Sequence, residues 1–325
     1  MKAVVFTKYG SPDVLRLEEM EKPVPGDNEV LIKVYAASVN DWDLSLLRGK
    51  PFVNRLLFGL LKPKINIIGC DVAGRVDAVG KNVSQFKTGD EVFGDLSESG
   101  FGAFAEYVSA RENVLVLKPA SMTFEEAASI PQAAMLAVQG LLDKGHLRPG
   151  QKILINGAGG GVGTFAVQIA RTQGVELTGV DNTGKQEMMS SIGFDHVIDY
   201  TREDFTKSGK CYDLILDVKM NRPIFAYTRV LCPNGIYVIV GGSMNWVLQA
   251  LFLGPFISMF IKKKIQIVAL KPNKDLGYIK ELFEAGKLRP IIDGPYNLDE
   301  VPEVLRYFGE GRHKGKIVIT MKPNI

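Results

Sequence analysis

The pattern of apolar and polar positions divides the chain into regions that differ in the spacing of their apolar residues. Short alternating runs, punctuated by Gly and Pro, fill roughly the first 120 residues and predict a β-rich part. Strands are expected there at residues 2–7, 29–36 and 72–79. After Met122, apolar strands alternate with segments of helical spacing, which indicates βαβ units and a parallel sheet. A tail with predicted helices at 275–285 and 299–309 ends in a predicted strand at 316–320.

A glycine-rich turn joins a predicted strand, 152–156, to a predicted helix, 164–171. Bare backbone amides at such a helix start, together with the helix dipole, bind the pyrophosphate of a dinucleotide. Glycine is needed because a Cβ would block that approach. The fingerprint has alanine where the first of three glycines is usual, and it predicts cofactor contacts at Ala158, Gly160, Gly161, Val162 and Gly163. Without further support, the same run is also compatible with a plain glycine-rich loop.

A second predicted strand, 175–180, follows the helix and ends on Asp181. That is roughly 20 residues after the glycines, where an acid binds the adenosine ribose in dinucleotide folds. Nucleotides bind at the carboxyl edge of a parallel sheet, so later strand ends are candidates as well. These later candidates are Val218, Gly241 and Gly242.

Length and composition restrict the class of protein. A chain of 325 residues is longer than one ordinary domain, so two domains are expected. The net charge is only +3 and there is no basic stripe, which disfavours nucleic acid as a partner. Three widely spaced cysteines argue against a disulfide framework, and the apolar start reads as a strand rather than a signal peptide. We therefore expect a cytoplasmic protein.

Two segments, 52–61 and 246–261, are rich in large apolar residues and lie outside the regular rhythm. The second is shorter than the roughly 20 residues that span a bilayer, so a transmembrane helix is not expected. Three interpretations remain open: additional core or a dimer surface, apolar covers over a substrate cleft, or weak contact with a membrane surface helped by Lys262–Lys264.

Several motifs, taken together and in order, resemble one family. They are Ala37-Ser38-Val39-Asn40-x-x-Asp43, Gly69-Cys70-Asp71-Val72-Ala73-Gly74-Arg75-Val76, Gly80-Lys81-Asn82-Val83, Gly89-Asp90-Glu91-Val92, Asn156–Gly163, Asp195–Tyr200 and His313-x-Gly315-Lys316. On these residues the chain resembles the medium-chain dehydrogenase/reductases, in particular their zinc-independent quinone oxidoreductase-like branch.

The resemblance implies an α/β fold in which a Rossmann doubly wound parallel sheet is inserted in a GroES-like β-rich catalytic domain. We place the catalytic domain at residues 1–122 and 268–325, and the dinucleotide-binding domain at 123–267. It also implies a cleft where the nicotinamide meets the substrate, and a homodimer joined through the Rossmann sheets.

Zinc is not expected. The positions that match a Cys and a His ligand of zinc-dependent relatives hold Asn40 and Cys70, and no four-cysteine lobe is present. A single candidate ligand does not make a tetrahedral site. Cys70 is expected to be a small buried residue rather than a nucleophile.

Hydride transfer without a metal favours an acceptor that spreads the incoming charge, such as a quinone or an α,β-unsaturated carbonyl. The apolar segments suggest that this acceptor is hydrophobic. Asn40 and Asp43 are the candidate catalytic residues: Asn40 as an amide donor, and Asp43 either in chemistry or in a local ion pair with Arg48. Two alternatives remain: a non-catalytic nucleotide-binding protein, and a zinc-free alcohol dehydrogenase.

The signals for the cofactor conflict. Asp181 would repel the 2′-phosphate of NADPH, whereas Lys185 and Tyr200 lie where the branch often contacts that phosphate. We expect NAD(P)H, with NADH slightly preferred. The tail motif suggests a further cofactor contact at Lys316, and Leu136 stands where the family usually has a threonine near the nicotinamide.

Overall fold

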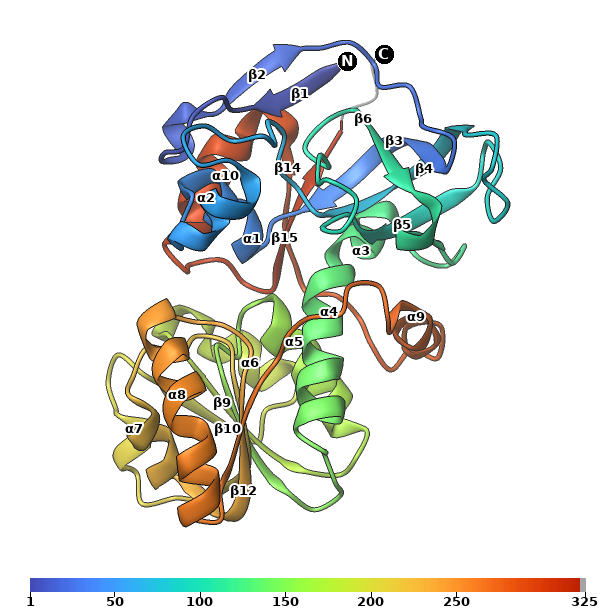
Figure 1. The fold of residues 1–325 in the computed structure, drawn as a ribbon. Coiled ribbons are helices and arrows are strands. Elements are labelled where there is room, and N and C mark those ends of the chain that lie inside the picture. Colours follow the sequence, from blue (N-terminus) through green and yellow to red (C-terminus); the bar gives the residue numbers. More distant parts are fainter. Residues whose placement is uncertain (322–325) are drawn as a thin grey trace. The chain divides into compact units, whose positions relative to one another are not determined.

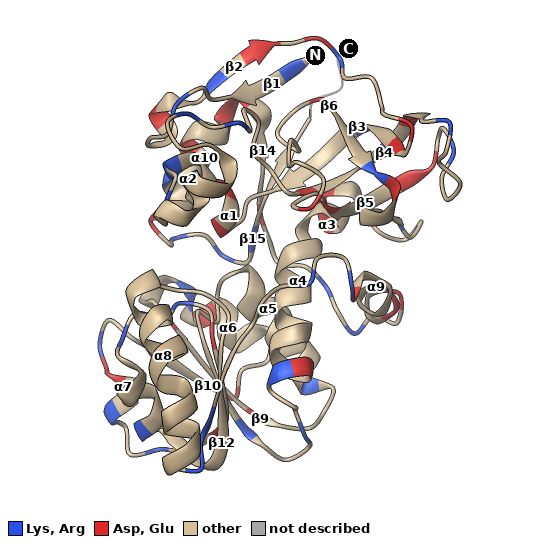
Figure 2. Cartoon of the chain, viewed as in Figure 1, with Lys and Arg blue, Asp and Glu red and all other residues tan. Residues whose placement is uncertain are grey.

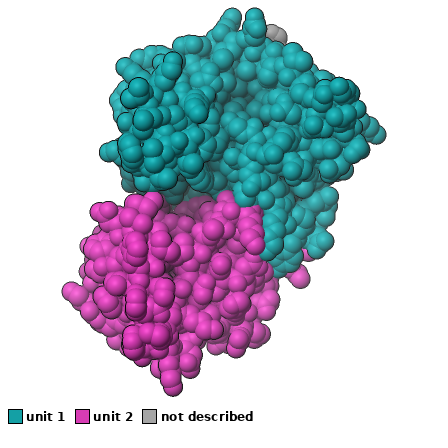
Figure 3. Space-filling model, in the orientation of Figure 1, with its two compact units in different colours: residues 1–132, 272–284, 292–325 teal, residues 133–271, 285–291 magenta. Residues whose placement is uncertain are grey.

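The structure is a computed structural model that describes residues 1–321. The chain packs into two units (Figure 3). Unit 1 comprises residues 1–132, 272–284 and 292–325, and unit 2 comprises residues 133–271 and 285–291. The unit boundaries thus fall at 132/133 and 271/272, whereas the sequence placed the domain boundaries at 122/123 and 267/268; those domain boundaries stay predictions.

Unit 2 is built on a six-stranded sheet in which all neighbouring strands are parallel. Its strands are β8 (Lys152–Asn156), β9 (Glu176–Asp181), β10 (His196–Asp199), β11 (Tyr212–Asp217), β12 (Leu231–Ile239) and β13 (Lys264–Ile267). Across the sheet they run β10-β9-β8-β11-β12-β13. This is the Rossmann order, with the switch point beside β8. The predicted doubly wound parallel sheet is confirmed.

Helices lie on both faces of this sheet (Figure 1). They are α4 (Pro131–Val138), continued by a π-helical turn at Gln139–Lys144, α5 (Gly161–Arg171), α6 (Gln186–Ser191), α7 (Ile224–Arg229) and α8 (Met244–Phe260). α8 falls in an apolar segment for which the sequence predicted no helix. It carries no charged residue, so it lacks the amphipathic period from which a helix is inferred (Figure 2).

Unit 1 contains a seven-stranded sheet to which both ends of the chain contribute. Its strands are β3 (Glu29–Ser38), β4 (Asp71–Val79), β5 (Glu91–Asp95), β6 (Tyr107–Arg111), β7 (Val116–Leu117), β14 (Ile292–Asn297) and β15 (Lys316–Thr320). Their order is β14-β15-β3-β4-β5-β7, and β6 also pairs with β3. Antiparallel pairing of β15 with β3, with Val318 opposite Ser38, joins the tail to the N-terminal part. The predicted insertion of a Rossmann sheet into a β-rich domain is confirmed.

The remaining elements of unit 1 cover this sheet and its edges. They are the hairpin β1 (Lys2–Val5) and β2 (Arg16–Glu19), and the helices α1 (Asp41–Arg48), α2 (Phe52–Phe58), α3 (Phe124–Ser129), α9 (Leu276–Glu284) and α10 (Val301–Gly309). Thr123 caps the start of α3: its side chain accepts the N–H of Glu126, and the carboxylate of Glu126 accepts the N–H of Thr123.

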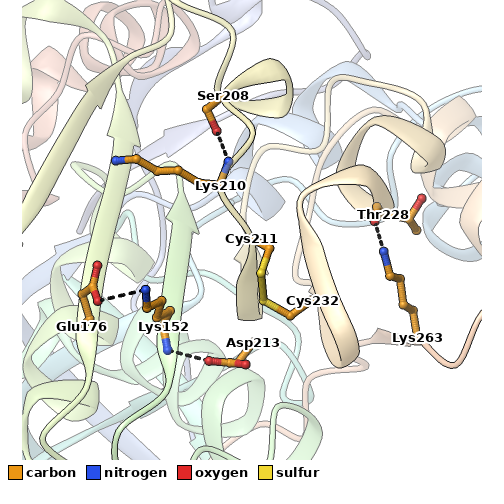
Figure 4. The surroundings of a disulfide bond; sticks show 9 residues. All are labelled: Lys152, Glu176, Ser208, Lys210, Cys211, Asp213, Thr228, Cys232 and Lys263. Atoms are coloured by element: carbon orange, nitrogen blue, oxygen red, sulfur yellow. Dashed lines mark hydrogen bonds and ion pairs between the residues drawn. A yellow bond between two sulfur atoms is a disulfide. The ribbon is translucent and has the colours of Figure 1, made fainter.

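Cys211 and Cys232 form a disulfide in unit 2, a bond that the spacing of the cysteines in the sequence did not lead us to expect (Figure 4). The two residues are 21 positions apart in sequence. They meet because they flank the starts of the neighbouring parallel strands β11 and β12, where Tyr212 pairs with Leu231. Cys70 is the free cysteine and is buried, as expected.

Both unassigned apolar segments lie largely at the surface. The exposed apolar side chains are Phe52, Val53, Leu56, Leu57, Leu60 and Leu61 in the first segment, and Leu248, Leu251, Phe252, Phe256, Met259, Phe260 and Ile261 in the second. The interpretation as additional core is therefore wrong for these residues. Within residues 1–321, no helix has the length and hydropathy needed to cross a lipid bilayer.

Candidate functional site

The glycine turn of unit 2 links the end of β8 to α5. Gly157 has φ 85°, a backbone conformation that side-chain-bearing residues rarely adopt. A Cβ at Gly163 would lie 2.4 Å from the carbonyl oxygen of Ala158, so glycine lets α5 pack directly on the turn. Residues 160–162 remain partly accessible at the start of α5, where first-turn N–H groups have no acceptor within the helix. This arrangement suits a pyrophosphate.

Asp181, at the end of β9, lies against the same turn. Its Oδ2 accepts the N–H of Gly159 at 2.9 Å, and its Oδ1 lies 3.4 Å from Nζ of Lys185. Both side chains are almost buried, with 8% and 4% of their surface exposed. The two residues that gave opposite signals for cofactor choice thus form one ion pair, in which the ammonium offsets the carboxylate charge. Tyr200 is adjacent: its N–H donates to the Asp181 carbonyl at 3.2 Å, and its ring is exposed.

The ends of β11 and β12 carry the remaining predicted cofactor residues of unit 2. Val218 donates its N–H to the carbonyl of Asn156 at 3.0 Å, and Met220 donates to the carbonyl of Gly241 at 3.1 Å. Gly242 has φ 137°, and a Cβ there would lie 2.5 Å from the backbone of Met220. Because the carboxyl ends of parallel strands meet at one edge, the structure brings all these residues to the same edge as the glycine turn.

Asp217 lies beneath this edge and is fully buried. Burial raises the pKa of its carboxyl to about 6, although Tyr237 and Asn156 donate hydrogen bonds to it at 2.6 Å and 2.7 Å. Its contacts hold β8, β11 and β12 in register. Leu136, which replaces the family's usual threonine, is half-buried on α4.

A buried polar cluster in unit 1 contains Asn40. Nζ of Lys316 lies 2.6 Å from the Asn40 Oδ1 and 3.2 Å from Oδ2 of Asp71. Nδ2 of Asn40 donates to Asp71 at 2.9 Å, and makes longer contacts with the Cys70 sulfur at 3.2 Å and the Ser38 carbonyl at 3.5 Å. One amide hydrogen is therefore firmly bound, and the other has only weak acceptors. We call Asn40, Asp71 and Lys316 the Asn40 cluster.

Lys316 belongs to this cluster through all three of its donors. Besides Asn40 and Asp71, its ammonium donates to the carbonyl of Val39 at 3.0 Å. The side chain is 4% exposed. All three hydrogen bonds of the ammonium thus go to groups of unit 1, and the predicted contact of Lys316 with the cofactor stays a prediction.

Asp43 has backbone partners. Its carboxylate accepts the N–H of Asn40 at 2.7 Å and the N–H of Gly69 at 2.9 Å, so it closes the start of α1 and ties it to the segment that leads into β4. The side chain is fully buried, and burial raises its pKa to about 7. This geometry gives Asp43 a positioning role, and the expected ion pair with Arg48 is replaced by these two backbone donors.

Asp71 is the central acceptor of the cluster, and the sequence did not single it out. It is fully buried and accepts hydrogen bonds from Ser38 and Asn40, from the backbone N–H of Gln132 and from Lys316. A signal was present: Asp71 is a lone acid in an otherwise apolar or small-residue run, and a buried charge requires partners. Its partners come from positions far apart in the chain, which the local pattern does not reveal.

Three possible metal ligands lie together in this region: Cys70, Asp71 and Asp95, whose ligand atoms are all within 4.8 Å of one another. Their surroundings do not suit a divalent cation. Burial, followed by the nearby carboxylates, raises the pKa of the Cys70 thiol well above its usual value, and a neutral thiol is a poor ligand. Asp71 is already neutralised by Lys316 at 3.2 Å. The set holds one thiol, two carboxylates and no histidine, and the expected absence of zinc stays a prediction.

Two family matches agree with the two kinds of structure. Residues 26–120 match the family described as "Alcohol dehydrogenase GroES-like domain", and residues 192–319 match the one described as "Zinc-binding dehydrogenase". The first match lies within unit 1, whereas the second includes β10–β13 of unit 2 and β14 and β15 of unit 1.

Relatives match over nearly the whole chain. A 2-methylene-furan-3-one reductase of Solanum lycopersicum is 33% identical over 98% of this chain and 79% of its own length. An NADPH-dependent alkenal/one oxidoreductase of Arabidopsis thaliana is 31% identical over the same shares. Among solved structures, the quinone oxidoreductase from Coxiella burnetii covers 99% of each chain with a TM-score of 0.89 at 27% identity. With this fold, these motifs and these relatives, the chain belongs to the medium-chain dehydrogenase/reductase superfamily, in its quinone oxidoreductase-like branch.

Proposed function

We propose that this protein is an NAD(P)H-dependent oxidoreductase that reduces a quinone or an α,β-unsaturated carbonyl. The observation that carries the proposal is the Asn40 cluster, in which a buried lysine and a carboxylate bind an amide that would act as the electrophile without a metal. Relatives named as quinone, alkenal/one and furanone reductases support the same class of acceptor.

The nicotinamide cofactor supplies the hydride, and residues of unit 2 hold it. We assign the pyrophosphate to the amides at the start of α5, from Gly160 to Gly163, because they lack intrahelical acceptors. Asp181, Lys185 and Tyr200 are assigned to the adenosine ribose, and the strand ends at Val218, Gly241 and Gly242 to the rest of the cofactor.

Asn40 is proposed as the donor to the acceptor oxygen. Lys316 binds its carbonyl and Asp71 binds one amide hydrogen, so the amide is polarised and fixed in orientation. The second hydrogen, whose acceptors are the Cys70 sulfur at 3.2 Å and the Ser38 carbonyl at 3.5 Å, is the one offered to substrate, because a thiol sulfur is a weak acceptor. A conjugated oxygen carries the transferred charge over several atoms, so one such donor is sufficient without zinc. Lys316 is a positioning residue in this scheme, and bulk water reprotonates the product.

We propose NADH as the slightly preferred cofactor. The carboxylate of Asp181 accepts ribose hydroxyls and disfavours a 2′-phosphate. The ion pair with Lys185 weakens the discrimination by Asp181 against the 2′-phosphate of NADPH. It does not remove that discrimination, because the Asp181 carboxylate is also held in place by the N–H of Gly159. A modest preference, rather than an absolute one, is the expected result.

A stopped-flow experiment tests the activity. NADH or NADPH bound to the full-length protein is mixed with 1,4-benzoquinone or an alkenal, and loss of nicotinamide fluorescence is followed. Oxidation in a single turnover supports the proposal. Tight cofactor binding without oxidation by either acceptor class would favour the alternative of a non-catalytic nucleotide-binding protein, and oxidation of alcohols with NAD⁺ would favour an alcohol dehydrogenase. Elemental analysis showing stoichiometric zinc would contradict the metal-free mechanism.

A homodimer is part of the proposal. β13 is an edge strand of the unit 2 sheet, and its residues Ile265 and Ile267 form an apolar groove with α8 residues such as Leu251 and Pro255. A second copy that pairs with this edge would cover both the free strand and the groove. Light scattering tests it.

The predicted cytoplasmic location also remains to be tested, by cell fractionation, because the Cys211–Cys232 disulfide is more typical of oxidising compartments.

A further inference from the structure

The segment formed by α2 and the loop after it presents an exposed apolar face that supplies none of the residues assigned to the proposed mechanism. We call it the α2 face and define it by its exposed side chains: Phe52, Val53, Leu56, Leu57, Leu60 and Leu61. Their exposure ranges from 49% at Val53 to 90% at Leu61. Contiguous apolar surface on a folded protein usually marks a binding surface.

The opposite side of the same segment is fixed to unit 1. Asn54 is buried and donates to the carbonyl of Lys50 at 3.1 Å, while the hydroxyl of Tyr9 donates to the carbonyl of Gly59 at 2.6 Å. The ring of Phe58 packs edge-on against Trp42 and Phe101. The α2 face is therefore the outer side of an ordered element, and its side chains are directed away from the core of unit 1.

The charges within this segment are of one sign. Residues 45–64 contain five basic residues and no acidic residue: Arg48, Lys50, Arg55, Lys62 and Lys64. Lys50, Lys62 and Lys64 are exposed and flank the apolar side chains. Since the whole chain has a net charge of only +3, this segment is strongly cationic compared with the rest of the molecule.

We propose that the α2 face docks on an anionic lipid surface. Such a surface offers both features that the segment requires: acyl chains for the exposed Phe and Leu side chains, and phosphate or carboxylate headgroups for the lysines. A second copy of this chain fits less well, because two α2 faces would bring like charges together. The contact is peripheral, since no helix among residues 1–321 is able to cross a bilayer. This inference does not depend on the proposed reductase activity.

Vesicle flotation with the full chain tests the proposal. The protein is mixed with vesicles of phosphatidylcholine alone, or of phosphatidylcholine and phosphatidylserine. We expect binding to the anionic vesicles that weakens with added salt. Removing two apolar side chains, in Phe52→Ser/Leu57→Ser, should lower the apparent affinity about tenfold or more. Reversing two charges, in Lys62→Glu/Lys64→Glu, should have a similar effect.

Matched controls distinguish binding through the α2 face from nonspecific adsorption to vesicles. Phe225→Ser/Leu117→Ser removes one exposed Phe and one exposed Leu elsewhere, and Lys210→Glu/Lys287→Glu makes the same change of net charge at exposed sites. Both control variants should bind vesicles like the unmodified protein. Reduction of water-soluble benzoquinone, measured in parallel, reports separately on the proposed activity.

Three results would overturn the proposal. The first is no binding to anionic vesicles at low salt. The second is equal loss of binding in the α2-face variants and their controls. The third is a fall in solution mass in Phe52→Ser/Leu57→Ser, measured by light scattering, which would show that a second copy covers the face.

Discussion

The Nζ atom of Lys316 lies 2.6 Å from Oδ1 of Asn40, although 276 residues separate them in the chain. The contact exists because β15 pairs with β3, which brings the last strand of the chain beside the segment that leads into α1. The orientation of the proposed substrate donor therefore depends on the association of both ends of the chain.

Loss of the Lys316 ammonium should affect both stability and activity. Lys316→Met leaves the fully buried Asp71 carboxylate without its cation, which is expected to lower the free energy of unfolding by about 3 kcal/mol. The turnover number kcat should fall as well, because the Asn40 amide loses its fixed orientation. Urea unfolding and steady-state kinetics measure the two effects.

A double-mutant cycle gives the control for this prediction. Asp71→Asn combined with Lys316→Met should be less destabilised than the sum of the single variants, because no unpaired charge remains. Lys314 is exposed and lies two positions away, so Lys314→Met should have a free energy of unfolding and a kcat close to those of the unmodified protein. Simple additivity in the cycle would show that the pair is not coupled.

Truncation of the proposed donor should act on the chemical step. Asn40→Ala is expected to lower kcat about a hundredfold, as loss of a single oxyanion donor commonly does. Binding of NADH, followed by fluorescence, should change little, because the cofactor residues lie in unit 2. An unchanged kcat would remove Asn40 from the mechanism.

Cofactor preference should respond to Asp181. Asp181→Ser removes the carboxylate that disfavours a 2′-phosphate and leaves the Lys185 ammonium in place, so the ratio of kcat/KM for NADPH to that for NADH should rise roughly tenfold. Asp199→Ser, which removes an acid at the end of the neighbouring strand, serves as the control. A strong NADPH preference in the unmodified protein would contradict the role given to Asp181.

The stability of the protein should fall as the pH rises from about 4 to about 7. Burial raises the pKa of Asp43 to about 7 and the pKa values of Asp95 and Asp217 to about 6. A carboxyl group whose pKa is higher in the native state than in the unfolded state stabilises the fold at pH values below its unfolded-state pKa. That contribution to the free energy of unfolding is lost as the pH rises through the native-state pKa.

Urea unfolding at several pH values measures this slope, and Asp95→Asn provides a matched variant. Oδ2 of Asp95 has no hydrogen-bond partner among residues 1–321, so the amide removes a titrating group without removing a bond to that atom. The free energy of unfolding of this variant should fall less steeply with rising pH than that of the unmodified protein. A stability that rises with pH across this range would refute the prediction.

Removal of the disulfide should destabilise unit 2. A cross-link between residues 21 positions apart restricts the unfolded chain, and its loss is expected to cost about 3 kcal/mol. Cys211→Ser/Cys232→Ser should therefore melt at a lower temperature than the oxidised protein and near that of the reduced protein. Thiol titration of the unfolded, oxidised protein should find Cys70 alone; three reactive thiols would show that the bond does not form.

Local pattern was sufficient for much of the fold. The run 152–156 has three consecutive apolar residues at its centre, so apolar side chains point to both faces of the strand. This is expected of a strand that is covered on both faces, and the run is β8. The cap at Thr123 predicts α3 because side chain and backbone partners lie within one turn. α8 was missed for the opposite reason: its sequence is apolar all round, so it has no period that distinguishes it from a buried strand or loop.

The candidate site was predicted in part. The glycine turn and Asp181 follow from spacing, since a dinucleotide imposes distances that short segments satisfy. The pairing of Asp181 with Lys185 also lies within one turn, yet the sequence presented it as a conflict. The partners of Asp43 were missed because they are backbone groups, and a sequence pattern carries no direct record of backbone donors.

What the residues dictate without further information is the class of this protein: strand and helix periods, a turn where glycine is required, and a composition with few metal ligands all arise from neighbours in the chain. Folding settles the rest. The Asn40 cluster, the Cys211–Cys232 bond and the outward direction of the α2 face all depend on which distant segments pack together, and packing is a property of the whole chain because each buried charge or apolar surface must find its partner in space.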